Sequence, residues 1–134
     1  MNIALMAHDR KKDLMVQFCT AYCGILAGHS LCATNTTGKL VADATGLPIM
    51  LYLPCKQGGN QQIGARVTYN ELEMVLFFAD SSQSADAYRE VYEIGRLCDM
   101  HNVPFATNVA TAEMLILGLR EGYLDWRDIV NPKK

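Results

Sequence analysis

The chain lacks an excess of charge of either sign. Its 134 residues carry 12 basic and 14 acidic side chains, which gives a formal net charge of -2. These charges are scattered rather than gathered in runs, so the sequence offers no basic field of the kind that holds a nucleic-acid backbone. We therefore expect no nucleic acid among its partners.

The chain also lacks a long hydrophobic run. No apolar stretch reaches the ~18–20 residues of a membrane span. The start, MNIALMAHD, has neither the apolar core nor the small-residue cleavage site of a signal peptide. We expect a cytoplasmic protein with no membrane partner. Half of its residues are apolar, which suffices for one domain over residues 1–134 with a buried core.

The cysteines form no C-x-x-C pair. There are five, at Cys19, Cys23, Cys32, Cys55 and Cys98, and this odd number in apolar segments favours reduced thiols over a disulfide framework. Cys19 and Cys23 are four residues apart, so on a helix they would share one face and supply half a metal site. No His or Cys pair elsewhere has complementary spacing. We interpret them as small core side chains and expect no metal ion.

Apolar runs rich in β-branched residues alternate with segments of helical period. This alternation predicts βαβ units around a parallel sheet. Three amphipathic stripes predict helices, and Gly28 and Gly122 are the predicted ends of the first and last of them. The stripes span residues 14–26, 88–98 and 112–119. The predicted strands are Ile3–Ala7, Leu31–Asn35, Ile49–Leu53, Met74–Ala79 and Val103–Thr107.

The segment after the first predicted strand is rich in charge. In an open parallel sheet, ligands bind outside the carboxyl ends of the strands, so the loops there are where a site is expected. Here His8 and Asp9 precede three cations that end at Lys12, a composition that suits an anionic ligand at a helix start. The alternative is an ordinary charged first turn with Asp9 as its N-cap.

The segment after the second predicted strand combines hydroxyl groups with a glycine. Thr34, Thr36 and Thr37 are followed by Gly38. Hydroxyls and backbone N–H groups at a helix start can cradle a phosphate, and a glycine lets a ligand approach the main chain. Lys12 would emerge on the same edge of the sheet, which favours a phosphate site.

The segment after the third predicted strand holds two glycines followed by three amides, Asn60 to Gln62. A flexible turn capped by Asn60 would explain the glycines but would leave both glutamines without a role. In the same segment Cys55 stands beside Lys56, near a helix start, where a thiol pKa is lowered; the alternative, which we favour, is a tolerated small residue. After the fourth predicted strand, Asp80 is expected at the rim of the crevice.

Five motifs in order and spacing resemble the methylglyoxal synthases, over essentially the whole chain. The resemblance implies a three-layer α/β/α sandwich with a five-stranded, mainly parallel sheet, assembled as a homohexamer. It also implies conversion of dihydroxyacetone phosphate to methylglyoxal and inorganic phosphate through an enediol(ate), without a cofactor. The motifs are Ala7-His8-Asp9 with Lys12, Thr34-x-Thr36-Thr37-Gly38, Gly58-Gly59-x-Gln61-Gln62-x-Gly64-Ala65, Phe78-x-Asp80 and Ala106-Thr107-Asn108-x-x-Thr111-Ala112.

By this resemblance the site divides into a binding half and a reacting half. The binding half would hold the phosphate or phosphorylated metabolite, and the reacting half would include the position of the base, at Asn60, and three groups near it. The binding residues are Lys12, Thr34, Thr36, Thr37, Gly38, Cys55 and Gly59, and the reacting residues are Asn60, Asp80, Asp9 and His8.

The reacting half departs from the family pattern. The family has an aspartate, the proposed base, directly after the two glycines, whereas this chain has Asn60, and an amide cannot accept a C–H proton. Pro54-Cys55 replaces a Ser-Gly pair whose main chain helps to bind phosphate. Ala87 replaces the histidine expected to polarise the carbonyl, and Glu90 stands where aspartate is usual.

Two hypotheses about function therefore remain open. In the first, the chain is a divergent synthase in which Asp9 or Asp80 serves as the base. In the second, it is a catalytically silent relative that binds phosphate or a phosphorylated metabolite as a regulatory or sensing module.

Overall fold

The computed structural model describes residues 1–132, and its centre is a parallel five-stranded sheet. The strands lie in the order β3-β2-β1-β4-β5, and every neighbouring pair is parallel. They are β1 (Asn2–Ala7), β2 (Ser30–Ala33), β3 (Ile49–Leu51), β4 (Met74–Phe78) and β5 (Phe105–Ala106).

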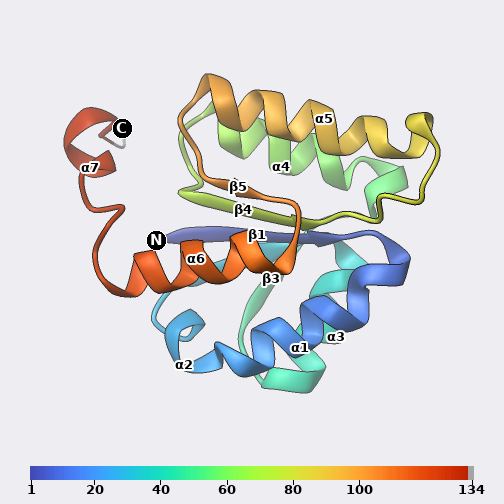
Figure 1. Cartoon of the computed structure of the whole chain (residues 1–134), viewed down its shortest axis with the longest axis horizontal. Coiled ribbons are helices and arrows are strands. Elements are labelled where there is room, and N and C mark those ends of the chain that lie inside the picture. Colours follow the sequence, from blue (N-terminus) through green and yellow to red (C-terminus); the bar gives the residue numbers. More distant parts are fainter. Residues whose placement is uncertain (133–134) are drawn as a thin grey trace.

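Helices cover both faces of this sheet, which confirms the predicted three-layer α/β/α architecture (Figure 1). The helices α1, α2, α3 and α6 pack on one face, and α4 and α5 pack on the other. Their bounds are η1 (Asp9–Lys11), α1 (Lys12–Ala21), α2 (Cys23–Leu26), α3 (Asn35–Thr45), η2 (Cys55–Gln57), α4 (Gly59–Thr68), α5 (Ala85–Met100), α6 (Val109–Arg120) and α7 (Arg127–Val130).

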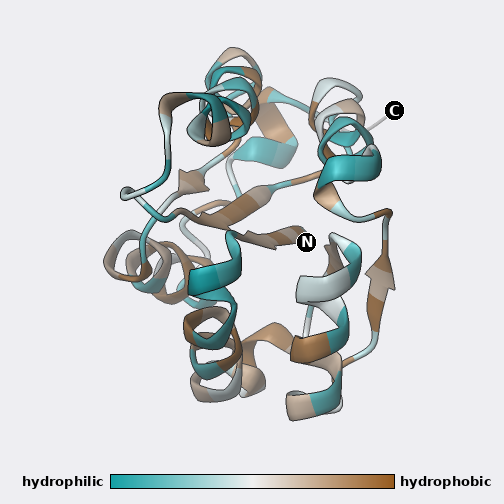
Figure 2. Ribbon diagram, turned by 90° about the vertical axis from the view of Figure 1, so that its right-hand side faces the viewer, coloured by the Kyte–Doolittle hydropathy of each residue, from teal (hydrophilic) through white to brown (hydrophobic). Residues whose placement is uncertain are grey.

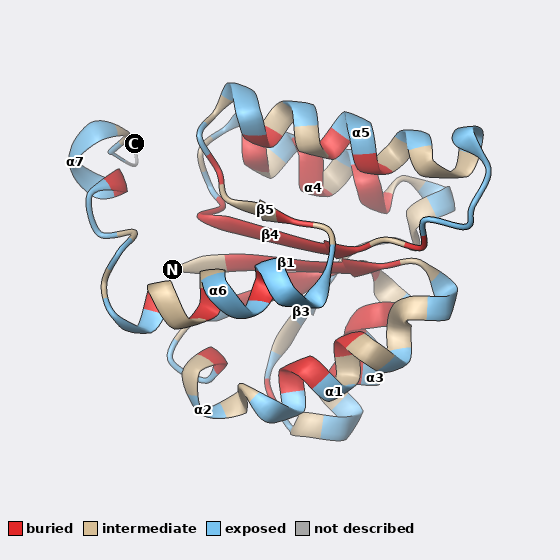
Figure 3. Ribbon diagram, viewed as in Figure 1, coloured by how far each residue is buried: buried red, intermediate tan, exposed pale blue. Residues whose placement is uncertain are grey.

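The sheet separates two apolar cores, one on each of its faces. Along β1, Ile3 and Leu5 face the core under α1 and α6, while Ala4 and Met6 face the core under α4 and α5, because successive strand side chains point to opposite faces. Strands buried on both faces need continuous apolar runs, and Figure 2 shows the strands coloured mostly as hydrophobic. Figure 3 shows β4 and most of β1 as buried.

Strands β2, β3, β4 and β5 all end earlier than predicted. Strand β2 ends at Ala33 because Thr34 already occupies the N-cap position of α3. Strand β3 ends at Leu51, although the N–H of Tyr52 still donates to the carbonyl of Ala33. Strand β5 keeps only two residues, since Pro104 has no N–H to give to a ladder.

The prediction of one helix along the apolar stripe of residues 14–26 is wrong, because the helix breaks at Tyr22. The segment forms two helices, α1 and α2, and Tyr22 between them has φ -107° and ψ 21°. Its ring packs on Phe18, with centroids 5.0 Å apart, and its hydroxyl donates to Glu113 Oε2 at 2.6 Å. These contacts hold Tyr22 against α6 while the chain turns.

The predicted end of α6 is confirmed. Gly122 follows this helix with φ 79°, a left-handed conformation in which glycine stops a helix without steric cost. The short helix α7 beyond it had no signal in the apolar pattern. Its Arg127 is buried, and the guanidinium donates to the carbonyl of Asn102 at 2.9 Å. Within residues 1–132, no helix is both long and apolar enough to cross a membrane.

Candidate active site

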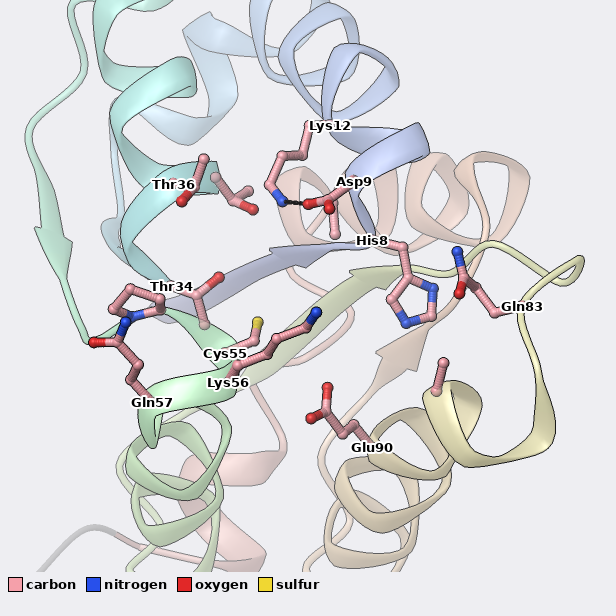
Figure 4. A pocket seen from close by; sticks show the side chains of 14 residues that line it. His8, Asp9, Lys12, Thr34, Thr36, Cys55, Lys56, Gln57, Gln83 and Glu90 are labelled. Carbon is pink, nitrogen blue, oxygen red and sulfur yellow. Dashed lines mark hydrogen bonds and ion pairs between the residues drawn. The ribbon is translucent and has the colours of Figure 1, made fainter.

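A cavity of about 410 Å³ opens at the carboxyl ends of the strands (Figure 4). Loops that follow β1, β2, β3 and β4 all contribute to it, together with the first turns of α5. This is the edge at which parallel sheets place their ligands. Its lining residues are Ala7, His8, Asp9, Lys12, Thr34, Thr36, Thr37, Pro54, Cys55, Lys56, Gln57, Gln83, Ala87 and Glu90.

The loop after β1 brings a lysine and a carboxylate into the cavity. Lys12 is the first residue of α1, and its ammonium donates to the carboxylate of Asp9. That hydrogen bond, followed by the positive charge of Lys12, lowers the pKa of Asp9. The side chain of Asp9 is 91% exposed and caps no helix; His8 holds the N-cap position of η1. The alternative in which Asp9 is an N-cap is therefore wrong.

The ring of His8 is held by the main chain of the neighbouring loop. The N–H of Asp80 donates to His8 Nδ1 at 2.8 Å, so Nδ1 carries no proton and the neutral ring carries it on Nε2. His8 Nε2 is buried and has no hydrogen-bond partner among residues 1–132. The rings of Phe77 and Tyr88 meet it edge-on, with centroids 5.2 and 6.1 Å away. His8 thus offers one unused N–H donor.

The three threonines stand at the start of α3. Thr34 is in its N-cap position, and all three side chains line the cavity. Thr37 is 1% exposed, and its hydroxyl oxygen has no hydrogen-bond partner in the part of the chain that the structure describes. A buried hydroxyl without a partner is costly unless a ligand or water satisfies it, so Thr37 indicates a polar ligand at this helix end.

Gly38 serves packing rather than the ligand. It does not line the cavity. A Cβ built there would lie 2.3 Å from the side chain of Leu51 and 3.0 Å from Cβ of Ala33. The glycine therefore allows α3 to approach the sheet closely, which differs from the predicted approach of a ligand to its main chain.

The two glycines of the third loop shape its path. Gly58 has φ 109°, and a Cβ on Gly59 would lie 2.0 Å from the carbonyl oxygen of Leu53. Gly59 does not line the cavity, but its N–H donates to the carbonyl of Pro54 at 3.1 Å. Gln62 Oε1 accepts from the N–H of Leu53 at 2.8 Å. These contacts fold the loop so that residues 54–57 reach the cavity.

Asn60 follows this loop in the sequence and does not reach the cavity. It is the second residue of α4, 7% exposed, and is not among the residues that line the cavity. Gly58 occupies the N-cap position of α4, so the alternative in which Asn60 caps the helix is wrong. Neither polar atom of its amide has a hydrogen-bond partner among residues 1–132.

Asp80 also lies outside the cavity lining. Its carboxylate accepts from Ser82 Oγ at 2.6 Å, from the Ser82 N–H at 3.0 Å and from Gln83 Nε2 at 3.4 Å. The hydrogen bonds from Ser82 lower the pKa of Asp80. Its carboxylate thus organises the loop after β4, while its N–H positions His8.

The thiol of Cys55 lines the cavity next to Thr34. Burial raises the pKa of this thiol, and the hydrogen bond with the Thr34 side chain and the charge of Lys12 only partly oppose it. The hypothesis of a lowered thiol pKa is therefore wrong. All five cysteines are free, and within residues 1–132 no three His, Cys, Asp or Glu side chains are grouped to hold a metal ion.

Seven cavity residues were not predicted as site residues: Ala7, Pro54, Lys56, Gln57, Gln83, Ala87 and Glu90. Lys56 and Gln57 lie in the loop that the glycines shape, and Gln83 lies in the loop after β4. Glu90 and Ala87, three residues apart, project from α5 beside its buried stripe. For Ala87 and Glu90, the only signal in the sequence was the resemblance, which marked both positions as departures from the family pattern.

Comparisons with known proteins agree on one family. The model of the MGS-like domain matches residues 15–107. Methylglyoxal synthase of Caldicellulosiruptor saccharolyticus is 54% identical over 133 residues, covering 99% of this chain and 94% of that protein. The synthase of Lysinibacillus sphaericus is 51% identical over 127 residues, 95% of each chain. A crystal structure of methylglyoxal synthase from Elizabethkingia anophelis superposes with a TM-score of 0.77 at 34% identity, covering 86% of this chain and 76% of that one. The chain belongs to the methylglyoxal synthase family.

Proposed function

We propose that this chain converts dihydroxyacetone phosphate to methylglyoxal and inorganic phosphate. The observation that carries the proposal is that Lys12, the threonines at the start of α3 and the unused N–H of His8 line one cavity. A phosphate cradle thus lies beside a group able to polarise a carbonyl. The relatives described above are methylglyoxal synthases by name, which supports the same reaction.

The phosphate would lie between Lys12 and the start of α3. Lys12 supplies a positive charge, and the N-terminus of this 11-residue helix supplies backbone N–H groups. The Thr37 hydroxyl, buried without a partner within residues 1–132, would donate to a phosphate oxygen. In this arrangement the Lys12 ammonium, which has three N–H donors, contacts the phosphate and keeps its hydrogen bond to Asp9.

The rest of the triose phosphate would extend from the cradle toward His8. A base removes a proton from the hydroxymethyl carbon, and the carbonyl oxygen becomes an enediolate oxygen that His8 Nε2–H stabilises. The C–O bond to phosphate then breaks, and the bonding pair leaves with the phosphate. The enol aldehyde that remains tautomerises to methylglyoxal. None of these steps transfers electrons to an oxidant.

Phosphate release from dihydroxyacetone phosphate, with methylglyoxal measured in parallel, tests the proposal. We expect Lys12→Ala to weaken phosphate binding by about ten-fold or more, because a charge-assisted contact is lost. Lys39→Ala is the matched control, since Lys39 is exposed on α3 and does not line the cavity. Equal phosphate affinity of Lys12→Ala and the parent would contradict the cradle, and no release by the parent would contradict the activity.

A second candidate function is binding without turnover. The observation that favours it is the pair of departures: Asn60 carries an uncharged amide, and Ala87 presents only a methyl group to the cavity. A chain of this kind would report or sequester a phosphorylated metabolite. Calorimetric binding of dihydroxyacetone phosphate without phosphate release would select this candidate.

The proposal includes a cytoplasmic location and assembly of several copies, the hexamer being what the resemblance implies. Large apolar side chains exposed on the described surface support assembly, because such groups gather at contacts between subunits. They include Met50, Leu53, Tyr69, Tyr92, Met114, Tyr123 and Ile129. Light scattering that gave a monomer at micromolar concentration would contradict this part of the proposal.

A further inference from the structure

The proposed reaction needs a base, and the cavity lining holds two carboxylates, Asp9 and Glu90. Asp9 is paired with Lys12, which lowers its pKa, and its side chain points largely into solvent. A carboxylate held in its ionised form by a lysine is a weakened acceptor for a C–H proton. Asp9 is therefore a poor base.

Glu90 is the other carboxylate of the cavity. It is partly buried on α5 and makes no hydrogen bond or ion pair within residues 1–132. Figure 4 shows its carboxylate extending from α5 toward the space in front of His8 and Lys56. Nothing on the described surface of the cavity therefore competes for its lone pairs.

The neighbours of Glu90 place this carboxylate on the same side of the cavity as the donor of His8. Ala87 and Glu90 are three residues apart on α5, so their side chains project from the same face of this helix, and both line the cavity together with His8. Ala87, one turn earlier, contributes only a methyl group, so no polar side chain at that position separates His8 Nε2–H from Glu90. An unused donor and an unused base thus face one space.

The two other candidates for the base do not meet the requirement. Asn60 has no basic atom and does not line the cavity. The Asp80 carboxylate lies outside the lining, and three hydrogen bonds from Ser82 and Gln83 occupy it.

We propose that Glu90 is the base of this chain, an inference that rests on the proposed function. Its carboxylate takes the proton from the hydroxymethyl carbon, the C–H pair forms a C=C bond, and the carbonyl pair moves to the oxygen bound by His8 Nε2–H. When the C–O bond to phosphate breaks, the hydroxyl proton of the enediolate passes to the enolate oxygen as the aldehyde forms. The proton on Glu90 goes to the departing phosphate, which restores the carboxylate.

Glu90→Gln tests the inference, because it removes the basic oxygen at nearly constant volume. We expect kcat to fall about 10²- to 10⁴-fold, the usual contribution of a general base, with phosphate affinity unchanged. Glu90→Asp should retain part of the activity, since it keeps a carboxylate that is one methylene shorter. Glu93→Gln, exposed on the same helix, is the control and should behave as the parent.

Deuterium incorporation into dihydroxyacetone phosphate in D2O separates the base from the overall reaction. Exchange that the parent catalyses and Glu90→Gln does not would support Glu90 as the base. If the parent catalysed exchange but released no phosphate, the proposed function would be wrong while the assignment of the base would stand. Phosphate release that Glu90→Gln leaves unchanged overturns the base and leaves the proposed function standing. A parent that binds the substrate but catalyses neither exchange nor release overturns both.

Discussion

The N–H of Asp80 donates a hydrogen bond to Nδ1 of His8 across 72 positions of the sequence. A second contact supports it, since the N–H of His8 donates to the carbonyl of Phe78 at 3.0 Å. Both hydrogen bonds link the loop after β1, the central strand, to the end of the neighbouring strand β4. This pairing fixes which ring nitrogen of His8 carries the proton, and so makes Nε2–H a donor toward the cavity.

His8→Asn and His8→Phe separate the two ring nitrogens. The amide oxygen of His8→Asn can still accept from the N–H of Asp80 but offers no group at the place of Nε2, so we expect kcat to fall about 10²- to 10³-fold with stability nearly unchanged. His8→Phe also leaves the N–H of Asp80 unpaired, which should cost a further 1–3 kcal/mol, roughly, in the free energy of unfolding. Steady-state kinetics and urea denaturation measure both. Unchanged kcat in His8→Asn would contradict a role for the Nε2–H donor.

Asn60→Asp tests the position at which the family carries its aspartate. The new carboxylate would be buried, with no hydrogen-bond partner for either oxygen among residues 1–132. We expect the free energy of unfolding to fall by about 1–3 kcal/mol and kcat to stay within about three-fold of the parent, because Asn60 does not line the cavity. A gain of a hundred-fold in phosphate release would show that this position reaches the substrate. Gln17→Glu, at an exposed position of α1, is the comparison for the added charge.

The sequence was sufficient for the sheet and for the binding half of the site. Apolar runs buried on both faces, such as Ile3–Ala7, are visible without the structure, and the rule that ligands bind at the carboxyl ends of parallel strands brought His8, Lys12 and Thr34 to one edge. The break at Tyr22 was not visible, because an apolar stripe continues through it and the contact with Glu113 is 91 positions away.

The reacting half was harder to predict. Asp80 follows β4 and Asn60 lies in the first turn of α4, both at the expected edge of the sheet. The direction of each side chain, however, depends on local hydrogen bonds and on the loop path that Gly58 and Gly59 set. Glu90 lies on α5, where spacing alone does not distinguish a cavity-facing glutamate from a solvated one such as Glu93. The packing of that helix decides the difference.

His29 predicts a pH dependence of stability. Its Nδ1 accepts from the N-terminal ammonium at 2.9 Å, and burial, followed by that positive charge, lowers the pKa of His29 below 6.5, while Glu73 acts in the opposite direction. The unfolded chain therefore binds a proton more readily than the folded one between the lowered pKa and 6.5. The free energy of unfolding should rise as pH rises through that window. Urea denaturation from pH 5 to 7.5 measures this slope, which His29→Gln should reduce and His101→Gln should leave in place; equal slopes in the parent and His29→Gln would contradict it.

Gly59→Ala tests whether the third loop must be built on a residue without a side chain. The Cβ would lie 2.0 Å from the carbonyl oxygen of Leu53, a backbone atom that cannot turn aside as a side chain can. We expect a loss of roughly 1–3 kcal/mol in the free energy of unfolding, as for other overpacked sites, together with weaker phosphate binding, because Cys55 and its neighbours would leave the cavity. Gly24→Ala is the matched control: its Cβ would meet nothing within 4 Å, and it lies in α2, where alanine is the better helix former. Thermal denaturation and phosphate calorimetry on both variants give the comparison. If Gly59→Ala kept the stability and phosphate affinity of Gly24→Ala, the loop would tolerate a Cβ, and the close contact with Leu53 would not be what directs residues 54–57 into the cavity.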